Sequence, residues 1–251
     1  MTYSPWPVVA YAELDSTNAE ACRRADAGEA GPRWIIAGRQ SAGRGRRGRA
    51  WSSHPNNLSV TLLMRTERTP AQAALVSFVA ALAVADLART YVPDAVTALK
   101  WPNDLLLDGR KAAGLLVESG ASPRGGLWLA IGFGVNLAWA PTDSERPSTS
   151  LADHLGPGQT AAPSPGTAFR RLDEVMQARL AQWDREGSAS ILSDWTERAT
   201  GIPGPCAARL GRETLEGHAE GLEPDGALRL RLGDGSVRLI TAGDVFFGAS
   251  A

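Results

Sequence analysis

The alternation of apolar and polar residues predicts an α/β chain in which helices pack on a sheet. Leu58, Val60 and Leu62 alternate with Ser59 and Thr61, which indicates a half-buried strand over residues 58–63. Other short apolar segments predict strands at residues 34–37, 96–99, 105–107, 114–118 and 128–136, and residues 3–12 are expected to form a leading strand. The pattern therefore predicts a sheet as the scaffold of the chain.

Three stretches predict helices that cover this sheet. Thr17-Asn18-Ala19-Glu20 has the form of a capping box and predicts a first helix that ends near Gly28. Thr69 and Pro70 precede an apolar run that predicts a long buried helix to about Thr90. A third, amphipathic helix is predicted by the apolar stripe Phe169, Leu172, Met176, Leu180 and Trp183.

The C-terminal part of the chain reads as a separate small β domain. The segment 201–205, Gly-Ile-Pro-Gly-Pro, cannot continue a helix and marks a boundary. Short strands follow it at residues 208–210, 228–232 and 237–240, with turn-forming residues between them. We therefore expect a larger domain of residues 1–202 and a small β-barrel of residues 203–251.

Composition and charge limit the classes of protein to consider. Lys and Arg number 26 against 27 Asp and Glu, and a protein that coats polyanions is normally more basic. Cys22 and Cys206 lack metal-ligand spacing, which favours a reducing compartment. The N-terminus has no signal-peptide pattern, and Gln72 and Asp86 interrupt the longest apolar run. A soluble, cytoplasmic protein with no membrane partner is expected.

Residues 43–49, Gly-Arg-Gly-Arg-Arg-Gly-Arg, carry the most distinctive chemistry and are called the arginine strip below. Guanidinium groups separated by glycines favour anion binding, because arginine is a permanent cation and glycine lets the backbone approach a ligand. The strip matches the dinucleotide fingerprint G-x-G-x-x-G, but turn formers rather than a helix follow it. Arg49 and Ala50 replace the lysine and hydroxyl residue of a P-loop. A solvated loop and an RNA-contact strip stay open.

A second polar cluster stands where a predicted strand ends, at Lys100-Trp101-Pro102-Asn103-Asp104. Alone, this segment reads as an Asn-Asp turn with Trp101 in the core. The next hairpin, with Asp108-Gly109 as its tight turn, leads to Lys111 and to Gly114 within a strand. Residues 131–136, Ile-Gly-Phe-Gly-Val-Asn, again place glycines in a strand, which suggests the close approach of another backbone segment or of a ligand.

Taken together, these motifs make the chain resemble the biotin protein ligases. The resemblance runs across most of the chain and rests on Ser16-Thr17-Asn18, Gln40, the arginine strip with Trp51, Lys100 to Asp104, Lys111 to Gly114 and Gly132 to Asn136. It implies a catalytic α/β domain similar to that of class II aminoacyl-tRNA synthetases, followed by a small SH3-like β-barrel. It also implies that biotin and Mg-ATP form biotinyl-5'-adenylate and pyrophosphate. A lysine on the biotin carboxyl carrier domain of acetyl-CoA carboxylase or a related carboxylase would then accept the biotinyl group.

The resemblance also implies roles for individual side chains. Biotin is expected to contact Ser16, Thr17, Asn18, Gln40, Gly43, Arg44, Gly45, Arg46, Lys111 and Gly114. ATP is expected to contact Arg44, Arg47, Arg49, Trp51, Lys100, Asn103 and Asn136, with Trp51 over the adenine. Catalysis is assigned to Lys111, Arg46 and Asp104, and Mg²⁺ to Asn103 and Asp104. Ser16 and Thr17 serve equally well as helix caps, and Trp51 as a core residue.

Two further hypotheses concern how the strip works and what else the chain could be. Four like charges and three glycines should leave the strip mobile until an acyl-adenylate orders it. A lipoate or octanoate ligase or transferase resembles this fold but lacks the strip, and an RNA-binding module would use the strip directly. Only about a dozen residues precede Glu13, so neither a helix-turn-helix domain nor a DNA partner is expected. The sequence is compatible with a monomer or a homodimer.

Overall fold

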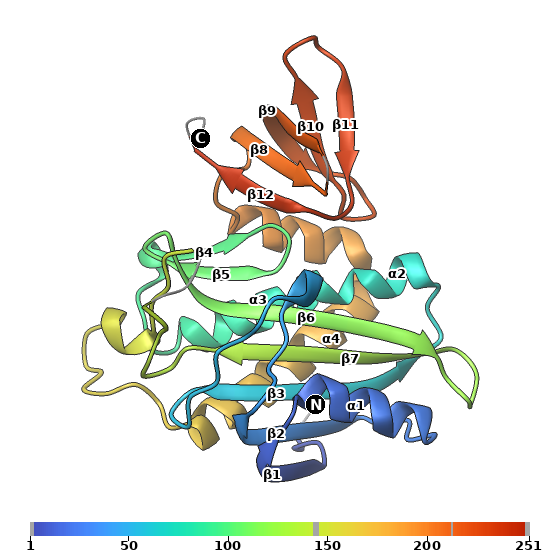
Figure 1. Cartoon of the computed structure of the whole chain (residues 1–251), viewed down its shortest axis with the longest axis vertical. Helices are drawn as coiled ribbons and strands as arrows, with labels where there is room; N and C mark the ends of the chain where they lie inside the picture. Colours follow the sequence, from blue (N-terminus) through green and yellow to red (C-terminus); the bar gives the residue numbers. More distant parts are fainter. Residues whose placement is uncertain (1–2, 143–145, 212, 249–251) are drawn as a thin grey trace.

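The computed structural model describes residues 3–142, 146–211 and 213–248 and contains two sheets (Figure 1). The larger sheet has seven strands in the order β1-β2-β3-β7-β6-β5-β4. β1 runs parallel to β2, and the other neighbours are antiparallel. The bounds are β1 Val8–Leu14, β2 Arg33–Gln40, β3 Leu58–Thr66, β4 Thr97–Lys100, β5 Asp104–Leu107, β6 Arg110–Ala121 and β7 Leu127–Val135. Each strand predicted in this part of the chain is present, and several are longer than predicted, but β1 starts at Val8 instead of the predicted residue 3.

Helices cover the two faces of the larger sheet unequally (Figure 1). α1 (Thr17–Asp26) packs on β2, β3 and β7 at the front. The other face carries α3 (Val76–Ala88), against which α4 (Pro165–Glu197) packs. α3 and α4 bury the main hydrophobic core, which includes Leu62, Leu82 and Trp195. The front face is consequently free to hold loops, including the arginine strip.

The predicted long helix is two helices, α2 (Pro70–Ala74) and α3. Thr69 caps α2 and Pro70 opens it, as predicted. The break lies at Leu75, whose N–H donates to the Gln72 carbonyl oxygen at 3.1 Å in a tight turn. Residues 70–88 have the length and composition of a membrane-crossing helix, but 72% of that window is buried inside the protein. It is the core segment that the sequence predicted.

The N-terminal cap of α1 differs from the prediction. Ser16, not Thr17, is the N-cap, and its hydroxyl accepts the Ala19 N–H at 3.4 Å. Glu20 does not close a capping box; its carboxylate instead accepts from Tyr11, Arg23 and Arg24. The prediction failed because two hydroxyl residues adjoin here, and the sequence pattern alone does not show which one adopts the extended backbone of an N-cap.

The second sheet has five antiparallel strands in the order β11-β10-β9-β8-β12. Their bounds are β8 Gly204–Leu210, β9 Glu213–Leu222, β10 Leu228–Leu232, β11 Val237–Ile240 and β12 Asp244–Phe247. β9 and β12 were not predicted. β8 begins next to the predicted boundary between residues 202 and 203. The division of the chain into two domains at that point stays a prediction.

The second sheet shares the main hydrophobic core, to which its residues Leu228, Leu230 and Val245 belong. The Trp101 indole N–H donates to the Gly226 carbonyl oxygen at 3.1 Å. Gly226 has φ +83°, and a Cβ there would lie 2.5 Å from the Phe78 ring, so this turn requires glycine. Short 3-10 helices complete the fold: η1 Arg46–Gly48, η2 Asp94–Val96 and η3 Leu151–His154. Asp108 and Gly109 both have positive φ, as the predicted hairpin turn between β5 and β6 demands.

Candidate functional site

One cavity on the front of the larger sheet collects most of the predicted site residues. It lies between α1, the arginine strip, the β4–β5 turn, β6 and β7, and it reaches the second sheet at residues 243–245. Predicted residues in its lining are Ser16, Thr17, Asn18, Gln40, Arg44, Gly45, Arg46, Arg49, Trp51, Asn103, Asp104, Lys111 and Gly114. Residues from both ends of the chain thus meet at one place.

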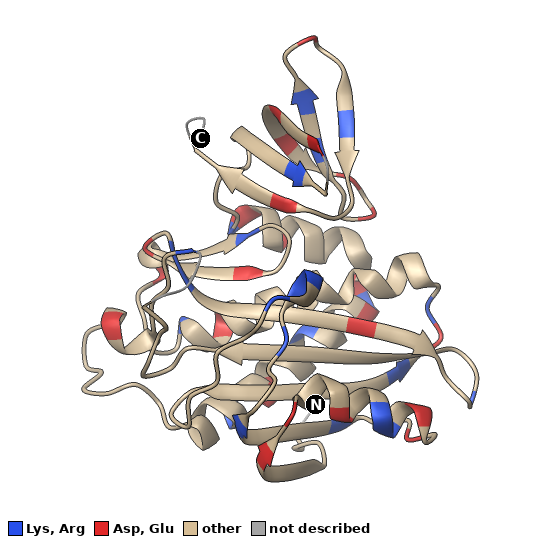
Figure 2. Ribbon diagram, viewed as in Figure 1, with Lys and Arg blue, Asp and Glu red and all other residues tan. Residues whose placement is uncertain are grey.

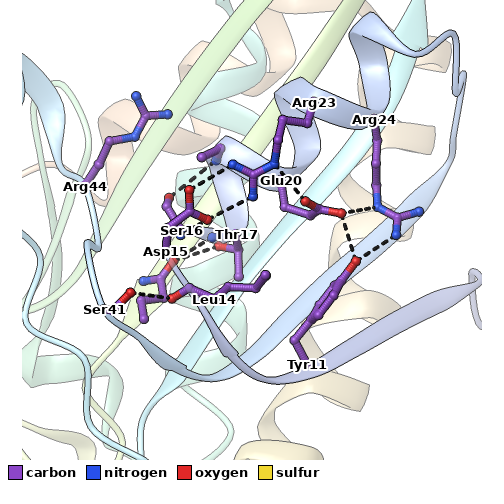
Figure 3. A network of polar contacts seen from close by, with 12 residues as sticks. Tyr11, Leu14, Asp15, Ser16, Thr17, Glu20, Arg23, Arg24, Ser41 and Arg44 are labelled. Atoms are coloured by element: carbon purple, nitrogen blue, oxygen red, sulfur yellow. Dashed lines mark hydrogen bonds and ion pairs between the residues drawn. The ribbon is translucent and has the colours of Figure 1, made fainter.

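The start of α1 forms one end of the cavity, and an exposed ionic cluster holds it (Figure 3). Arg23 donates to both carboxylate oxygens of Asp15, at 2.8 and 2.9 Å, and its hydrogen bond lowers the Asp15 pKa to about 2. Asp15 in turn accepts the Ser16 N–H at 2.7 Å. Because both side chains are about half exposed, we expect this pair to orient the loop rather than to add much stability.

Gln40, at the end of β2, is fixed against α1. The Thr17 N–H donates to Gln40 Oε1 at 2.8 Å, and the Thr17 hydroxyl lies 3.1 Å from the same oxygen. A backbone N–H can only donate, so it determines the orientation of the Gln40 amide. This end of the cavity is therefore polar and uncharged.

The arginine strip crosses the front of the sheet, where it forms a basic segment of the loop between β2 and β3 (Figure 2). It folds back on itself, since the Trp51 N–H donates to the Gly43 carbonyl oxygen at 2.9 Å. A Cβ at Gly43 would lie 2.5 Å from the Trp51 carbonyl oxygen, so that position requires glycine. Arg47 takes a left-handed conformation, φ 57°, inside η1.

Each arginine of the strip contacts an acceptor elsewhere in the protein. Arg44 donates to both oxygens of Glu118 on β6, at 2.8 and 3.1 Å, and Arg46 donates to the Asn103 side-chain oxygen at 3.1 Å. Arg47 and Arg49 both pair with Asp244 on β12. Burial of Arg46 lowers its pKa, although the guanidinium stays a cation at neutral pH. The strip therefore links the two sheets.

The charged end of the cavity centres on Asp104, which is 6% exposed. Its carboxylate lies 2.6 Å from the Lys111 ammonium and 3.5 Å from the Arg146 guanidinium. Lys100 lies just behind, 5.6 Å from the centre of the Phe246 ring, and burial followed by repulsion from Arg146 lowers its pKa. The cations exceed the carboxylates here, so this end of the cavity attracts anions.

Trp51 lies against the glycines of β6 and β7. A Cβ at Gly134 would lie 2.3 Å from the Trp51 ring, and one at Gly114 would lie 3.0 Å from it. The Lys111 ammonium sits 5.5 Å from the centre of the same ring. The glycines in these strands therefore make room for an aromatic side chain within the cavity.

Four predicted residues do not line the cavity: Gly43, Arg47, Lys100 and Asn136. Asn136 is 2% exposed, and its amide donates to the Thr149 carbonyl oxygen and accepts from Asn57. Several lining residues were not assigned to the site from the sequence, namely Ala50, Trp101, Pro102, Leu115, Leu116, Gly132, Phe133, Gly134, Arg146, Gly243, Asp244 and Val245. Gly132 and Gly134 belong to the glycine pattern noted in the sequence, whereas Asp244 and Arg146 carry no local signal.

No group of three or more His, Cys, Asp and Glu residues that could hold a metal occurs in the described ranges. Asn103 and Asp104, the pair predicted for Mg²⁺, already have partners in Arg46 and Lys111. They offer at most one carboxylate and one amide oxygen. Such a pair suits an ion held mainly by other oxygens, because Mg²⁺ in proteins is commonly bound through one or two carboxylates, substrate phosphates and water.

The chain matches known families over both sheets. Residues 15–136 match the Biotin/lipoate A/B protein ligase family, and residues 205–248 match the Biotin protein ligase C terminal domain. The structure of biotin protein ligase from Aquifex aeolicus in complex with biotin and ATP superposes with a TM-score of 0.79 at 19% identity, over 96% of this chain and 99% of that one. This likeness confirms the predicted fold, a class II synthetase-like domain with a small C-terminal β domain.

Two relatives are similar along nearly the whole chain. The Biotin--[acetyl-CoA-carboxylase] ligase of Paracoccus denitrificans is 41% identical over 239 residues, which cover 94% of this chain and 99% of the relative. The enzyme of the same name from Mycobacterium tuberculosis is 35% identical over 240 residues, which cover 93% and 86%. By sequence and by fold, this chain belongs to the biotin protein ligase family.

Proposed function

We propose that this protein is an ATP-dependent ligase that forms biotinyl-5'-adenylate from biotin and ATP and then transfers biotin to a carrier lysine. The observation that carries this proposal is the two-ended cavity. Its uncharged polar end holds Ser16, Thr17 and Gln40, and its cationic end holds Arg46 and Lys111. Biotin has the matching form, with a ureido ring at one end and a carboxylate at the other.

The cationic end suits the first reaction. The biotin carboxylate oxygen attacks the α-phosphorus of ATP, and the bond to pyrophosphate breaks. Both reactants are anions, so cations between them lower the barrier, and no nucleophile from the protein is needed. We assign this task to Lys111 and Arg46, with Asp104 holding the Lys111 ammonium in place at 2.6 Å.

Magnesium enters this scheme with ATP rather than as a resident metal. When bound, Mg²⁺ would neutralise phosphate charge. Asn103 and Asp104 are the protein oxygens that we assign to it. Their existing partners, Arg46 and Lys111, would have to share them with the ion.

In the second reaction, a lysine amine of the acceptor attacks the mixed anhydride carbonyl, an amide bond forms, and AMP leaves. We propose the biotin carboxyl carrier domain of acetyl-CoA carboxylase or a related carboxylase as the acceptor, in the cytoplasm. The two relatives named above, both Biotin--[acetyl-CoA-carboxylase] ligases, support this acceptor.

Two other functions are less well supported. A lipoate ligase is the nearest, because the matched family includes both biotin and lipoate ligases. The neutral polar end of the cavity argues against it, since lipoate has no ring N–H or carbonyl group to satisfy Thr17 and Gln40. RNA binding through the arginine strip is disfavoured because the chain is not basic overall, with 26 Lys and Arg against 27 Asp and Glu.

One assay tests the proposal. The protein is mixed with Mg-ATP and either biotin or lipoate, and pyrophosphate release is measured. A carrier domain is then added, and the mass of its acceptor lysine is determined. We expect pyrophosphate release that depends on biotin, followed by a biotinyl adduct on the acceptor lysine. Activity with lipoate alone would refute the proposal.

A further inference from the structure

We infer that Thr61, a residue outside the cavity lining, fixes the Thr17 hydroxyl as a hydrogen-bond acceptor toward the cavity and so selects a ligand that offers an N–H group. The inference rests on the proposed function and deepens it, because the ureido ring of biotin offers such groups. Thr61 is a positioning residue in this scheme, since it would act through Thr17.

The argument starts at Asn18, whose orientation is forced. Its side-chain nitrogen lies 2.9 Å from a Glu118 carboxylate oxygen and 3.1 Å from the Leu116 carbonyl oxygen. Both of these atoms only accept hydrogen bonds, provided that the carboxylate is ionised. The Asn18 NH₂ group must therefore face them, and its oxygen, Oδ1, must face the opposite way.

Asn18 Oδ1 faces Thr61 on the central strand β3. The Thr61 hydroxyl oxygen lies 2.7 Å from Asn18 Oδ1 and 2.8 Å from the Thr17 hydroxyl oxygen. A hydroxyl has one hydrogen to donate. Asn18 Oδ1 can only accept, so Thr61 donates its hydrogen to Asn18 and is left as an acceptor toward Thr17.

Thr17 must then donate inward. Its hydrogen goes to Thr61 at 2.8 Å or to Gln40 Oε1 at 3.1 Å, and Gln40 Oε1 already accepts the Thr17 N–H. In either case the hydrogen is used within the protein, and the lone pairs of Thr17 remain for the cavity that it lines. The cavity accordingly offers an acceptor at this point.

Burial keeps this chain of hydrogen bonds in one arrangement. Thr61 is 0% exposed, and Thr17 and Asn18 are each 4% exposed, so water does not readily replace any link. The opposite side is closed as well, because a Cβ at Gly132 would lie 2.0 Å from Asn18 Oδ1. A buried polar group that loses its partner is costly, which is why the order of donors should persist when a ligand binds.

A double-mutant cycle on the full-length protein tests the inference. Thr61→Val keeps the shape and removes the hydroxyl, and Thr61→Ser restores it. Biotin and ATP affinities are measured by calorimetry for each variant, alone and in a Thr17→Val background, with the unfolding temperature as a check. We expect Thr61→Val to weaken biotin about tenfold, Thr61→Ser to recover most of this loss, and ATP affinity to change less than twofold.

The decisive arm is the Thr17→Val background, where Thr61→Val should cost nothing further. An equal loss in both backgrounds, or a parallel loss of ATP affinity, would show that Thr61 acts by packing and would overturn the inference. If Thr61→Val does not fold, Thr61→Ala replaces it, with an expected loss of about tenfold that also vanishes without the Thr17 hydroxyl. Failure of the unsubstituted protein to bind biotin would instead overturn the proposed function, and the inference with it.

Discussion

The two ends of the cavity are held in different ways. At the neutral end, Thr17, Asn18 and Thr61 are almost fully buried and joined by short hydrogen bonds. At the other end, the arginine strip is held mainly by ion pairs whose arginines, such as Arg44 and Arg47, are 40% or more exposed. Exposed ion pairs contribute about 0–1 kcal/mol each, whereas breaking a buried hydrogen bond costs about 1–3 kcal/mol. We therefore expect the neutral end to keep its arrangement when a ligand binds and the strip to move more easily.

The sharpest test of this contrast lies at the charged end. Lys111→Ala removes the cation beside Asp104 and leaves that buried carboxylate with Arg146 as its neighbouring cation. We expect biotin-dependent pyrophosphate release to fall about 100- to 1000-fold, the range seen when one preorganised donor to a developing charge is lost. Arg110→Ala, at the adjacent exposed position, is the matched control and should retain activity. A normal rate for Lys111→Ala would remove Lys111 from the mechanism.

A substitution in the neutral end should also have a large effect. Gly132→Ala places a methyl group 2.0 Å from Asn18 Oδ1, which cannot retreat without breaking its contacts. We expect the free energy of unfolding to fall by about 1–3 kcal/mol and biotin affinity to fall with it. Gly221→Ala, on β9 with open space at the Cβ position, is the control. Unchanged unfolding and binding in Gly132→Ala would show that Asn18 can move aside, and would contradict a rigid neutral end.

The strip itself should affect retention more than recognition. Arg46→Ala removes the hydrogen bond to Asn103 and one cation from the cavity. We expect biotinyl-adenylate to leave about tenfold faster, since a charge-assisted hydrogen bond is lost, while biotin binding changes less. The release rate is measured by rapid filtration with labelled adenylate. Arg39→Ala, which removes the exposed ion pair between Arg39 and Glu13, serves as the control. An unchanged release rate would contradict the idea of a closing strip.

The smallest expected effect concerns the link between the strip and the second sheet. Asp244→Asn should loosen Arg47 and Arg49 and raise the rate of tryptic cleavage in the strip by up to about fivefold. Glu213→Gln, in an exposed pair with Arg238 on the same sheet, should leave that rate unchanged. Equal cleavage of Asp244→Asn and the unsubstituted protein would show that this link does not restrain the strip.

The same link has a definite pH dependence. Burial by itself raises the pKa of Asp244, but the hydrogen bond from Arg49 and the nearby arginine charges outweigh it and hold that pKa below its ordinary value. A lowered carboxyl pKa stabilises the folded state above the unfolded pKa, about 4, and this contribution is lost as the pH falls through the folded pKa. The restraint that Asp244 places on the strip should therefore be constant from pH 8 to 5 and weaken only in more acidic solution, which amide hydrogen exchange of the strip, corrected for its intrinsic pH dependence, would measure.

Much of the fold could be predicted because its strands alternate apolar and polar residues clearly, as in residues 58–63. That strand is nevertheless buried on both faces rather than half-buried as predicted, because its polar residue Thr61 lies beneath α1, against Thr17 and Asn18. β9 escaped prediction because Ala219 is its only buried residue and two glycines interrupt it, so no apolar face marks it. The first helix was predicted, but its N-cap was misplaced by one residue because Ser16 and Thr17 are both good caps.

The candidate site divides in a similar way. The arginine strip, Lys111 and Asp104 are chemically conspicuous, and the structure brings them to one cavity. Asp244, Arg146 and Thr61 are ordinary in sequence, and only the tertiary arrangement places them near it. Asn136 shows the opposite error. Its amide was predicted to contact ATP, but in the structure it is hydrogen-bonded to Thr149 and Asn57.

The cavity is bounded by residue 16 at one extreme of the chain and residue 245 at the other. Domains generally fold as they emerge during synthesis, starting from the N-terminus. Residues 243–245 are therefore among the last to leave the ribosome, and the cavity lacks the wall that they provide until then. A truncated product that stops before β12 would carry the whole arginine strip but not Asp244, the partner of Arg47 and Arg49.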